Sequence, residues 1–393
     1  MIYLDNAATS WPKPPEVLDA VAKALAAPAS PGRSGHRPAH EASKLIHKAR
    51  RRIQGLFGLP SPERVSFAAN VTWAINEAIE GFGLKEGDLV ISSALEHNST
   101  ARPLSRLRAQ KGIVWKIVPP RGDGLLHAGD FKDAMGPKLR LIVINHASNV
   151  TGALAPVKEI RAQAGDVPML LDAAQTAGAV PMEDIGQICD IVCFTGHKGL
   201  LGPTGTGGLW VREGIELRPL AVGGSGSKSE SLTHPDFMPD RLEAGTLNTH
   251  GLAGLAAGID YILQRGVQDI RAHESGLTRL FLERLSGIPG LRVLGPQLGE
   301  VRRVATVSVT LDGWSSSDIA RELEATGGIM IRSGLHCAPL AHEAMGTFPG
   351  GAARFSFGPF SQESDIVAAA DALKGLSSRK RPGTQGANAQ GRA

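Results

Sequence analysis

The sequence predicts an α/β fold in which a mostly parallel, seven-stranded sheet is flanked by helices and followed by a smaller α+β domain. Up to about residue 250, short apolar runs alternate with helical patterns. These runs are continuously apolar, as expected for parallel strands that are covered on both faces. Beyond residue 250, two long helical patterns come first and strands follow. A chain of 393 residues is long enough for two domains with separate cores.

The elements of the larger part follow from these apolar and helical periods. The predicted strands are Val65–Phe67, Leu89–Ser92, Ile113–Val118, Leu139–Asn145, Pro168–Asp172, Ile188–Phe194 and Gly208–Val211. The predicted helices are Val71–Glu80, Thr100–Gln110, Val157–Gln163 and Ala173–Gly178. Ligands of such sheets bind beyond the carboxyl ends of the strands, so the polar segments that follow these ends are expected to converge.

The later elements define the smaller part. They are helices at Gly251–Gln264, Val267–Leu285, Ser316–Ala325 and Gln362–Leu373, and strands at Leu291–Leu294, Val304–Thr310 and Ile329–Arg332. We therefore predict four parts of the chain: an N-terminal segment packed on the small domain (1–14), a large domain (15–250), a small domain (251–377) and a disordered tail (378–393). The tail is rich in Gly, Gln and Ala, a composition that cannot build a core.

Composition narrows the class of protein. The net charge is +4, and the tail alone carries four basic residues and no acid, which leaves the body near neutrality. A nucleic-acid partner is therefore not expected, and the basic run Lys48–Arg52 is interpreted as a solvated helix face. No apolar run approaches the roughly 18 residues of a membrane span. Three cysteines form no disulfide framework, so the expected location is the cytoplasm.

Lys198 is the most informative residue. It follows an apolar strand and precedes the Gly-rich stretch Gly202–Gly208. A lysine at such a strand end can form a Schiff base with a cofactor aldehyde, although a lone lysine is more often a solvated surface residue. Asp172 ends the preceding apolar run. It suits the pyridine nitrogen of pyridoxal phosphate (PLP), or equally the N-cap of a helix.

Three further side chains can serve the phosphate of such a cofactor. Hydroxyl and imidazole groups donate hydrogen bonds to phosphate oxygens. Thr72, Thr195 and His197 are the candidates, and the last two lie within three residues before Lys198.

Seven ordered motifs resemble the cysteine desulfurases, PLP enzymes of fold type I in the class V aminotransferase family. The match spans roughly residues 1–375, and its last motif has the form of the Suf-type group. The motifs are Tyr3–Thr9, Glu96–Ser99, His146–Gly152, Asp172–Gln175, Gly196–Lys198 with Gly202–Gly205, Glu243–Thr246, and Arg332–Ala338.

The resemblance implies roles for the cofactor residues. Lys198 would hold PLP and move the substrate Cα proton, while Asp172 would pair with the ring nitrogen. His97 would stack on the ring and shuttle protons. Gln175 and Asn149 would lie at the ring O3′, and Thr72, Thr195 and His197 would bind the phosphate. Gly245 and Thr246 would reach the phosphate of a neighbouring subunit, which implies a homodimer.

The resemblance also implies how the substrate is held and where its sulfur goes. Arg354 would clamp the carboxylate of L-cysteine by a bidentate pair, with Arg332 at the same mouth and Asn149 beside the substrate. Cys337 would take the sulfur as a persulfide, release alanine and pass the sulfur to an acceptor protein for iron–sulfur clusters or thio-cofactors. The nearby cations His336 and Arg332 would favour its thiolate.

Cys189 and Cys193 are expected to be buried structural residues. A metal site built on His336, Cys337 and His342 is unfavoured, because the fourth ligand is missing. Two alternatives stay open: a selenocysteine lyase or another PLP-dependent lyase or aminotransferase of class V, and a catalytically inactive scaffold with the same fold.

Overall fold

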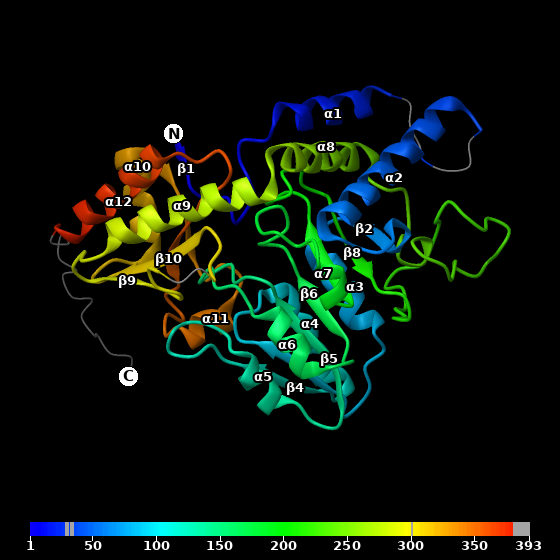
Figure 1. The fold of residues 1–393 in the computed structure, drawn as a ribbon, viewed down its shortest axis with the longest axis horizontal. Coiled ribbons are helices and arrows are strands. Elements are labelled where there is room, and N and C mark those ends of the chain that lie inside the picture. The colour runs from blue at the N-terminus through cyan, green and yellow to red at the C-terminus, as the bar shows by residue number, and fades with distance from the viewer. Residues whose placement is uncertain (28–30, 32–34, 300–301, 380–393) are drawn as a thin grey trace, which may run out of the picture.

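The computed structural model describes residues 1–27, 31, 35–299 and 302–379 (Figure 1). Its central sheet has seven strands: β2 (Val65–Ala68), β3 (Leu89–Ser93), β4 (Val114–Val118), β5 (Leu139–Asn145), β6 (Met169–Asp172), β7 (Ile191–Thr195) and β8 (Gly207–Val211). They lie in the order β2-β8-β7-β6-β5-β3-β4. β8 runs antiparallel to both neighbours and the other adjacent pairs are parallel, which confirms the predicted sheet.

Helices cover both faces of this sheet. They are α1 (Pro15–Ala26), α2 (Arg37–Phe57), α3 (Val71–Gly81), α4 (Asn98–Lys111), α5 (Ala128–Ala134), α6 (Val157–Ala164), α7 (Ile185–Ile188) and α8 (Thr249–Arg265). Alternate strand residues enter different cores: Met169 and Leu171 pack with α2, α6 and α8, whereas Leu170 packs with α3 and α4. This two-sided burial explains why the strands are continuously apolar. Figure 1 shows α8 running alongside α1 above the sheet.

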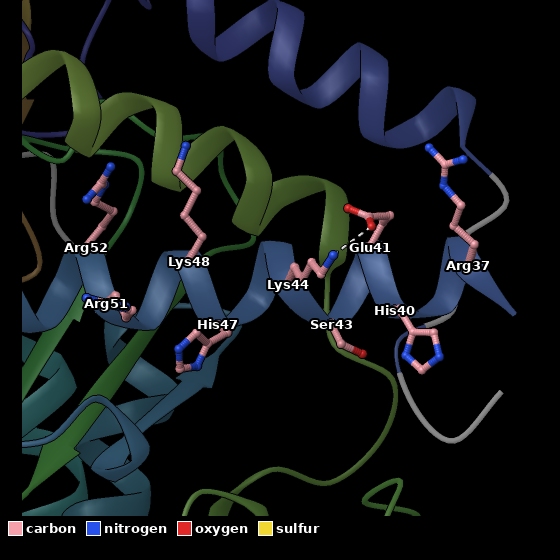
Figure 2. A pocket seen from close by; sticks show the side chains of 9 residues that line it. All are labelled: Arg37, His40, Glu41, Ser43, Lys44, His47, Lys48, Arg51 and Arg52. Carbon is pink, nitrogen blue, oxygen red and sulfur yellow. Dashed lines mark hydrogen bonds and ion pairs between the residues drawn. The ribbon is translucent and has the colours of Figure 1, made fainter. Parts of the chain in front are cut away.

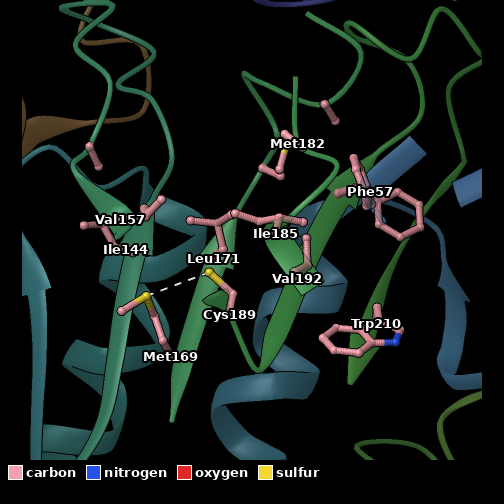
Figure 3. Close-up of a cluster of buried hydrophobic side chains, with 14 of the residues drawn as sticks. Phe57, Ile144, Val157, Met169, Leu171, Met182, Ile185, Cys189, Val192 and Trp210 are labelled. Carbon is pink, nitrogen blue, oxygen red and sulfur yellow. Dashed lines mark hydrogen bonds between the residues drawn. The ribbon is translucent and has the colours of Figure 1, made fainter. Parts of the chain in front are cut away.

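The two cysteines near β7 are buried, as predicted. Figure 3 shows Cys189 inside the first core, where its Sγ lies 3.8 Å from Sδ of Met169. Cys193 is in β7 and faces the opposite core. Burial raises the pKa of Cys189 to about 12, so this thiol stays protonated and unreactive at neutral pH.

A second, four-stranded antiparallel sheet has its own core. Its strands lie in the order β12 (Arg332–Gly334), β13 (Ala352–Ser356), β10 (Thr306–Leu311), β9 (Leu291–Val293). The remaining elements are β1 (Ile2–Tyr3), β11 (Ile329–Met330), α9 (Val267–Leu285), α10 (Ser316–Gly327), α11 (Pro339–Ala344) and α12 (Glu363–Ser377). β1 pairs in parallel with β11, so the first residues of the chain join elements more than 300 residues later.

The predicted domain boundaries remain predictions. The apolar face of α8, including Leu252 and Ile259, packs in the core of the larger sheet. The predicted disordered tail lies outside the described residues from position 380 onward. Within the described ranges, no helix combines the length and the apolar character needed to cross a bilayer.

The helix predicted over Ala173–Gly178 is wrong. The structure has turns there, in which the amides of Thr176 and Ala177 both donate to the carbonyl of Ala173. Gly178 then has a φ of +81°, which stops a right-handed helix. A Cβ at Gly178 would lie 2.4 Å from the carbonyl oxygen of Gly199, so the turn packs directly on the segment after Lys198.

The interpretation of Lys48–Arg52 as a solvated face is wrong for one of its basic residues. Arg50 lies on the buried side of α2 with Ile46 and Ile53. Its guanidinium forms a bidentate pair with Glu243 at 2.8 and 2.6 Å, and the amide of Phe67 also donates to Glu243 at 2.6 Å. The planar fork of arginine matches a carboxylate in this way, so the pair fixes the segment at Glu243 against α2 and β2.

Replacing Arg50 by alanine is expected to lower the free energy of unfolding by about 3–5 kcal/mol, because Glu243 would stay buried without its partner. Arg51→Ala changes an exposed neighbour on the same helix and is expected to stay within about 0.5 kcal/mol of the parent. Urea unfolding of both variants measures the difference. Equal changes in the free energy of unfolding would show that the buried pair contributes no more to stability than an exposed arginine does.

Candidate active site

Lys198 and Asp172 follow two adjacent strands of the central sheet. β6 ends at Asp172, β7 ends at Thr195, and the two strands pair in parallel, so both residues lie at the carboxyl edge of the sheet. Asp172 is buried, and one of its carboxylate oxygens accepts from the amide of Ala174 at 2.9 Å. This edge is where open parallel sheets bind their ligands.

The two groups perturb each other. Burial lowers the pKa of Lys198 to about 8, with Asp172 acting in the opposite direction and the cations Arg354 and Arg332 lowering it further. Burial raises the pKa of Asp172, against the influence of the Ala174 amide and of Lys198. A lysine whose pKa lies close to neutrality supplies free amine for nucleophilic and base chemistry.

Several buried polar atoms around this edge have no hydrogen-bond partner, among them Asn149 Oδ1, Thr195 Oγ1 and His197 Nδ1. Buried polar atoms are nearly always paired, so this unused capacity indicates room for a polar ligand. Gln175 lines a small cavity together with Lys198, and its amide donates to the carbonyl of Ala7 at 3.2 Å. The hydroxyl of Thr195 and the imidazole of His197 therefore fit the phosphate of a phosphorylated ligand.

His97 caps the start of α4. Its Nδ1 accepts from the amide of Ser99 at 3.0 Å, which leaves Nε2 to carry the proton of a neutral ring. Burial, followed by the charges of Lys198 and Arg332, lowers the pKa of His97 to about 4. The imidazole is therefore neutral at physiological pH, because burial and the nearby cations disfavour its protonated form.

Cys337 opens into the same cavity as His97. The cavity has a volume of about 330 Å³, and Thr72, on the first turn of α3, also lines it together with Arg102 and Arg106. Cys337 is the exposed one of the three free cysteines. The structure thus brings Thr72, His97 and Cys337 together although they are far apart in the sequence.

Two hydrogen bonds fix the backbone of the Cys337 loop. The side-chain amide of Asn149 donates to the carbonyl of His336 at 2.7 Å, and the amide of Asn98 donates to the carbonyl of Cys337 at 2.7 Å. The expectation that His336 is a cation beside the thiol is wrong. Its ring is buried, and burial lowers its pKa to about 3, which leaves it neutral at pH 7.

The two candidate substrate arginines are cross-strand partners. Arg332 on β12 stands opposite Arg354 on β13. Arg332 is exposed, whereas Arg354 is buried and pairs with Asp5 at 2.8 Å and with the carbonyl of Asn149 at 3.1 Å. Nε of Arg354 has no partner and remains available as a donor. Asp5 lies 349 residues from Arg354, so no spacing in the sequence could reveal this pair.

Gly245 and Thr246 do not join this group. Both are exposed, and Thr246 lines a separate cavity of about 350 Å³ with Trp73 and Glu77. The buried Arg50–Glu243 pair holds the segment that carries them. Their predicted role towards a neighbouring subunit stays a prediction.

A surface hollow without these residues lies elsewhere. It measures about 940 Å³ and follows the outer face of α2, where Figure 2 shows His40, Lys44, His47 and Lys48 along the helix. Its basic side chains are largely exposed and include no buried polar atom that lacks a partner. Among the described residues, no group of three His, Cys, Asp or Glu side chains could hold a metal ion.

Comparison with known proteins agrees with the fold. The family model described as Aminotransferase class-V matches residues 2–368. The chain therefore belongs to the class V aminotransferase family, which confirms the resemblance of the motifs. A probable cysteine desulfurase of Methanothermobacter thermautotrophicus is 34% identical over 361 residues, with 88% of each chain covered.

Solved structures extend this likeness. The apo structure of a cysteine desulfurase from Thermococcus onnurineus NA1 has a TM-score of 0.88 at 29% identity, covering 96% of this chain and 94% of that one. A variant of the cystine C-S lyase C-DES, with glycine covalently linked to its PLP cofactor, has a TM-score of 0.80 at 23% identity, covering 95% and 96%. The second likeness concerns the fold alone, and the predicted fold type I is confirmed.

Proposed function

We propose that this protein is a PLP-dependent cysteine desulfurase that converts L-cysteine to L-alanine and retains the sulfur on Cys337 as a persulfide. One observation carries the proposal: the exposed thiol of Cys337 and the imidazole of His97 line one cavity, and the charges of Lys198 and Arg332 act on that imidazole. The activity named for the 34% identical relative supports it.

The unpaired donors and acceptors suit PLP. When bound, PLP supplies an electron sink that weakens the bonds to the substrate Cα. Lys198 would hold the cofactor through Nζ, and Asp172 would pair with its ring nitrogen. Thr195, His197 and Thr72 are the proposed phosphate ligands, and Gln175 and Asn149 lie at the ring edge.

The side chains then divide the work on the substrate. Nε of Arg354 donates to the substrate carboxylate, and Arg332 lies beside it. Lys198 takes the proton from Cα as a neutral amine. The thiolate of Cys337 attacks the substrate sulfur, so an S–S bond forms as the C–S bond breaks. The carbon product gains one proton at Cβ, equivalent to the proton that the Cys337 thiol lost, and recovers its Cα proton from Lys198 before it leaves as alanine. Atoms therefore balance between L-cysteine plus thiol and L-alanine plus persulfide.

A direct assay tests this function. Purified protein loaded with PLP is incubated with L-cysteine and a thiol reductant, and alanine and sulfide are quantified. Equal yields of the two products support a desulfurase. Sulfide with pyruvate in place of alanine would indicate a lyase, and no product from either L-cysteine or L-selenocysteine would indicate an inactive scaffold.

We further propose a homodimer, a protein acceptor for the persulfide sulfur, and a cytoplasmic location. The exposed segment with Gly245 and Thr246 borders a cavity apart from Lys198, which suits contact with a second copy. Three free cysteines suit a reducing compartment. Sedimentation of the purified protein tests the dimer.

Asp172→Asn is expected to retain PLP binding while alanine formation falls roughly 10²-fold, because the ring nitrogen loses its anionic partner. Cofactor absorbance and alanine release are measured on the same samples. Wild-type turnover in this variant would remove Asp172 from its proposed role.

A further inference from the structure

A directional chain of hydrogen bonds runs behind the Cys337 loop. His336 Nε2 lies 3.3 Å from the carbonyl oxygen of Arg332, and His336 Nδ1 lies 3.3 Å from His342 Nε2. His342 Nδ1 lies 2.7 Å from the hydroxyl of Thr347. The side chains of His336, His342 and Thr347 are buried, and the planes of the two imidazoles lie at 29° to each other with their centroids 5.5 Å apart.

The carbonyl at one end and the neutral charge of both imidazoles determine which atom donates in each of these hydrogen bonds. A carbonyl only accepts, so His336 Nε2 must donate to Arg332. A neutral His336 then accepts at Nδ1, and His342 Nε2 must be the donor. A neutral His342 accepts at Nδ1 in turn, and the Thr347 hydroxyl donates to it. Burial lowers the pKa of His336 to about 3 and of His342 to about 4, which agrees with two neutral rings.

The chain ends on a strained turn. His336 and Cys337 have φ values of +51° and +56°, and the amide of Ala338 donates to the carbonyl of Leu335 across them. Two successive central residues with positive φ are typical of Gly or Asn, not of His and Cys. Such a conformation persists only where the surroundings hold it. Asn149 and Asn98 donate hydrogen bonds to the two carbonyls of this turn, and the chain of hydrogen bonds holds the imidazole of His336.

We propose that His342 and Thr347 are positioning residues that act through His336 to keep Cys337 in the left-handed turn that presents its thiol to the cavity with His97. The role of the thiol rests on the proposed desulfurase function. The hydrogen-bond chain and the turn do not, and they can be tested in the protein without cofactor.

A matched pair of variants isolates the Thr347 hydroxyl. Thr347→Val keeps the shape and removes the donor, whereas Thr347→Ser keeps the donor and removes a methyl group. In the cofactor-free protein, iodoacetamide should alkylate Cys337 about fivefold faster in the Val variant, the factor expected for one lost neutral hydrogen bond, and at the parent rate in the Ser variant. Equal rates in all three proteins would overturn the proposal.

Loaded enzyme gives a second readout. In the Val variant, kcat for alanine formation should fall about fivefold while KM for L-cysteine stays unchanged, because Arg354 and Lys198 are not touched. If the parent protein forms no alanine, the proposed function fails and the alkylation result still decides the inference. Faster alkylation with unchanged kcat would place the turn outside the sulfur-transfer step and overturn the positioning role.

Histidine tautomers test the chain without a variant. Selective ¹⁵N labelling should identify His336 and His342 as neutral Nε2–H tautomers at pH 7. A cationic ring or an Nδ1–H tautomer at either position would contradict the chain. Should Thr347→Val fail to fold, His342→Phe keeps a ring at that position without its donor. It is expected to accelerate alkylation in the same way, and parent-like alkylation would overturn the proposal.

Discussion

Lys198→Ala is expected to lose covalent PLP attachment and to lower alanine formation by roughly 10²–10⁴-fold, because the variant lacks both the amine that bonds the cofactor and the base that moves the Cα proton. Borohydride reduction of the PLP-loaded protein, followed by peptide mass spectrometry, locates the attachment. Alanine release measures the loss of turnover.

Lys13 is the matched control for this experiment. Its pKa is also lowered to about 8 by burial, and its Nζ donates to the carbonyl of His197 at 2.8 Å. Lys13→Ala is expected to keep the reducible attachment at Lys198. A label found on Lys13 in the parent protein would contradict the assignment of Lys198.

The pH dependence of attachment follows from the same lysine. Only the neutral amine bonds an aldehyde, and burial lowers the pKa of Lys198 to about 8. The attachment rate should therefore rise with pH up to about 8 and level off above it. A rate that keeps rising to about pH 10.5 would indicate an ordinary exposed lysine.

Cys337→Ser is expected to abolish persulfide formation and alanine release from L-cysteine while alanine release from L-selenocysteine continues. The substrate sulfur has no other exposed thiol to accept it, whereas selenium is the better leaving group. Cys189→Ala removes a buried thiol and should leave the persulfide on Cys337 intact. Retained cysteine activity in Cys337→Ser would make the enzyme a lyase.

The central sheet could be predicted because a strand that is buried on both faces has a continuous run of apolar residues. Six of the seven predicted strands match to within two residues at each end, and the seventh begins three residues late, since Cys189 belongs to the turn after α7. The strand β13 was not predicted. Its sequence, Ala352–Ser356, places Arg354 in the middle of a short run, and only a tertiary partner makes a buried arginine tolerable there.

Some residues of the site could be predicted from local sequence, and others depend on partners far away in the chain. Lys198, Asp172 and Cys337 have local signals, namely a strand end, an acid after an apolar run, and a thiol among polar residues. The roles of Asp5 and Arg50 depend on ion pairs with Arg354 and Glu243, respectively, which lie far away in the chain. The charge state of His336 also depended on burial that no local pattern displays, so the prediction of a cation there was wrong.

Because Cys189 and Cys193 are buried, the mass of the intact protein reports how much of Cys337 is modified. Since one sulfhydryl alone faces solvent, each molecule can carry a single stoichiometric adduct under native conditions. Whole-protein mass measurement would then report the loaded fraction directly, with no digestion and no background from the other two positions.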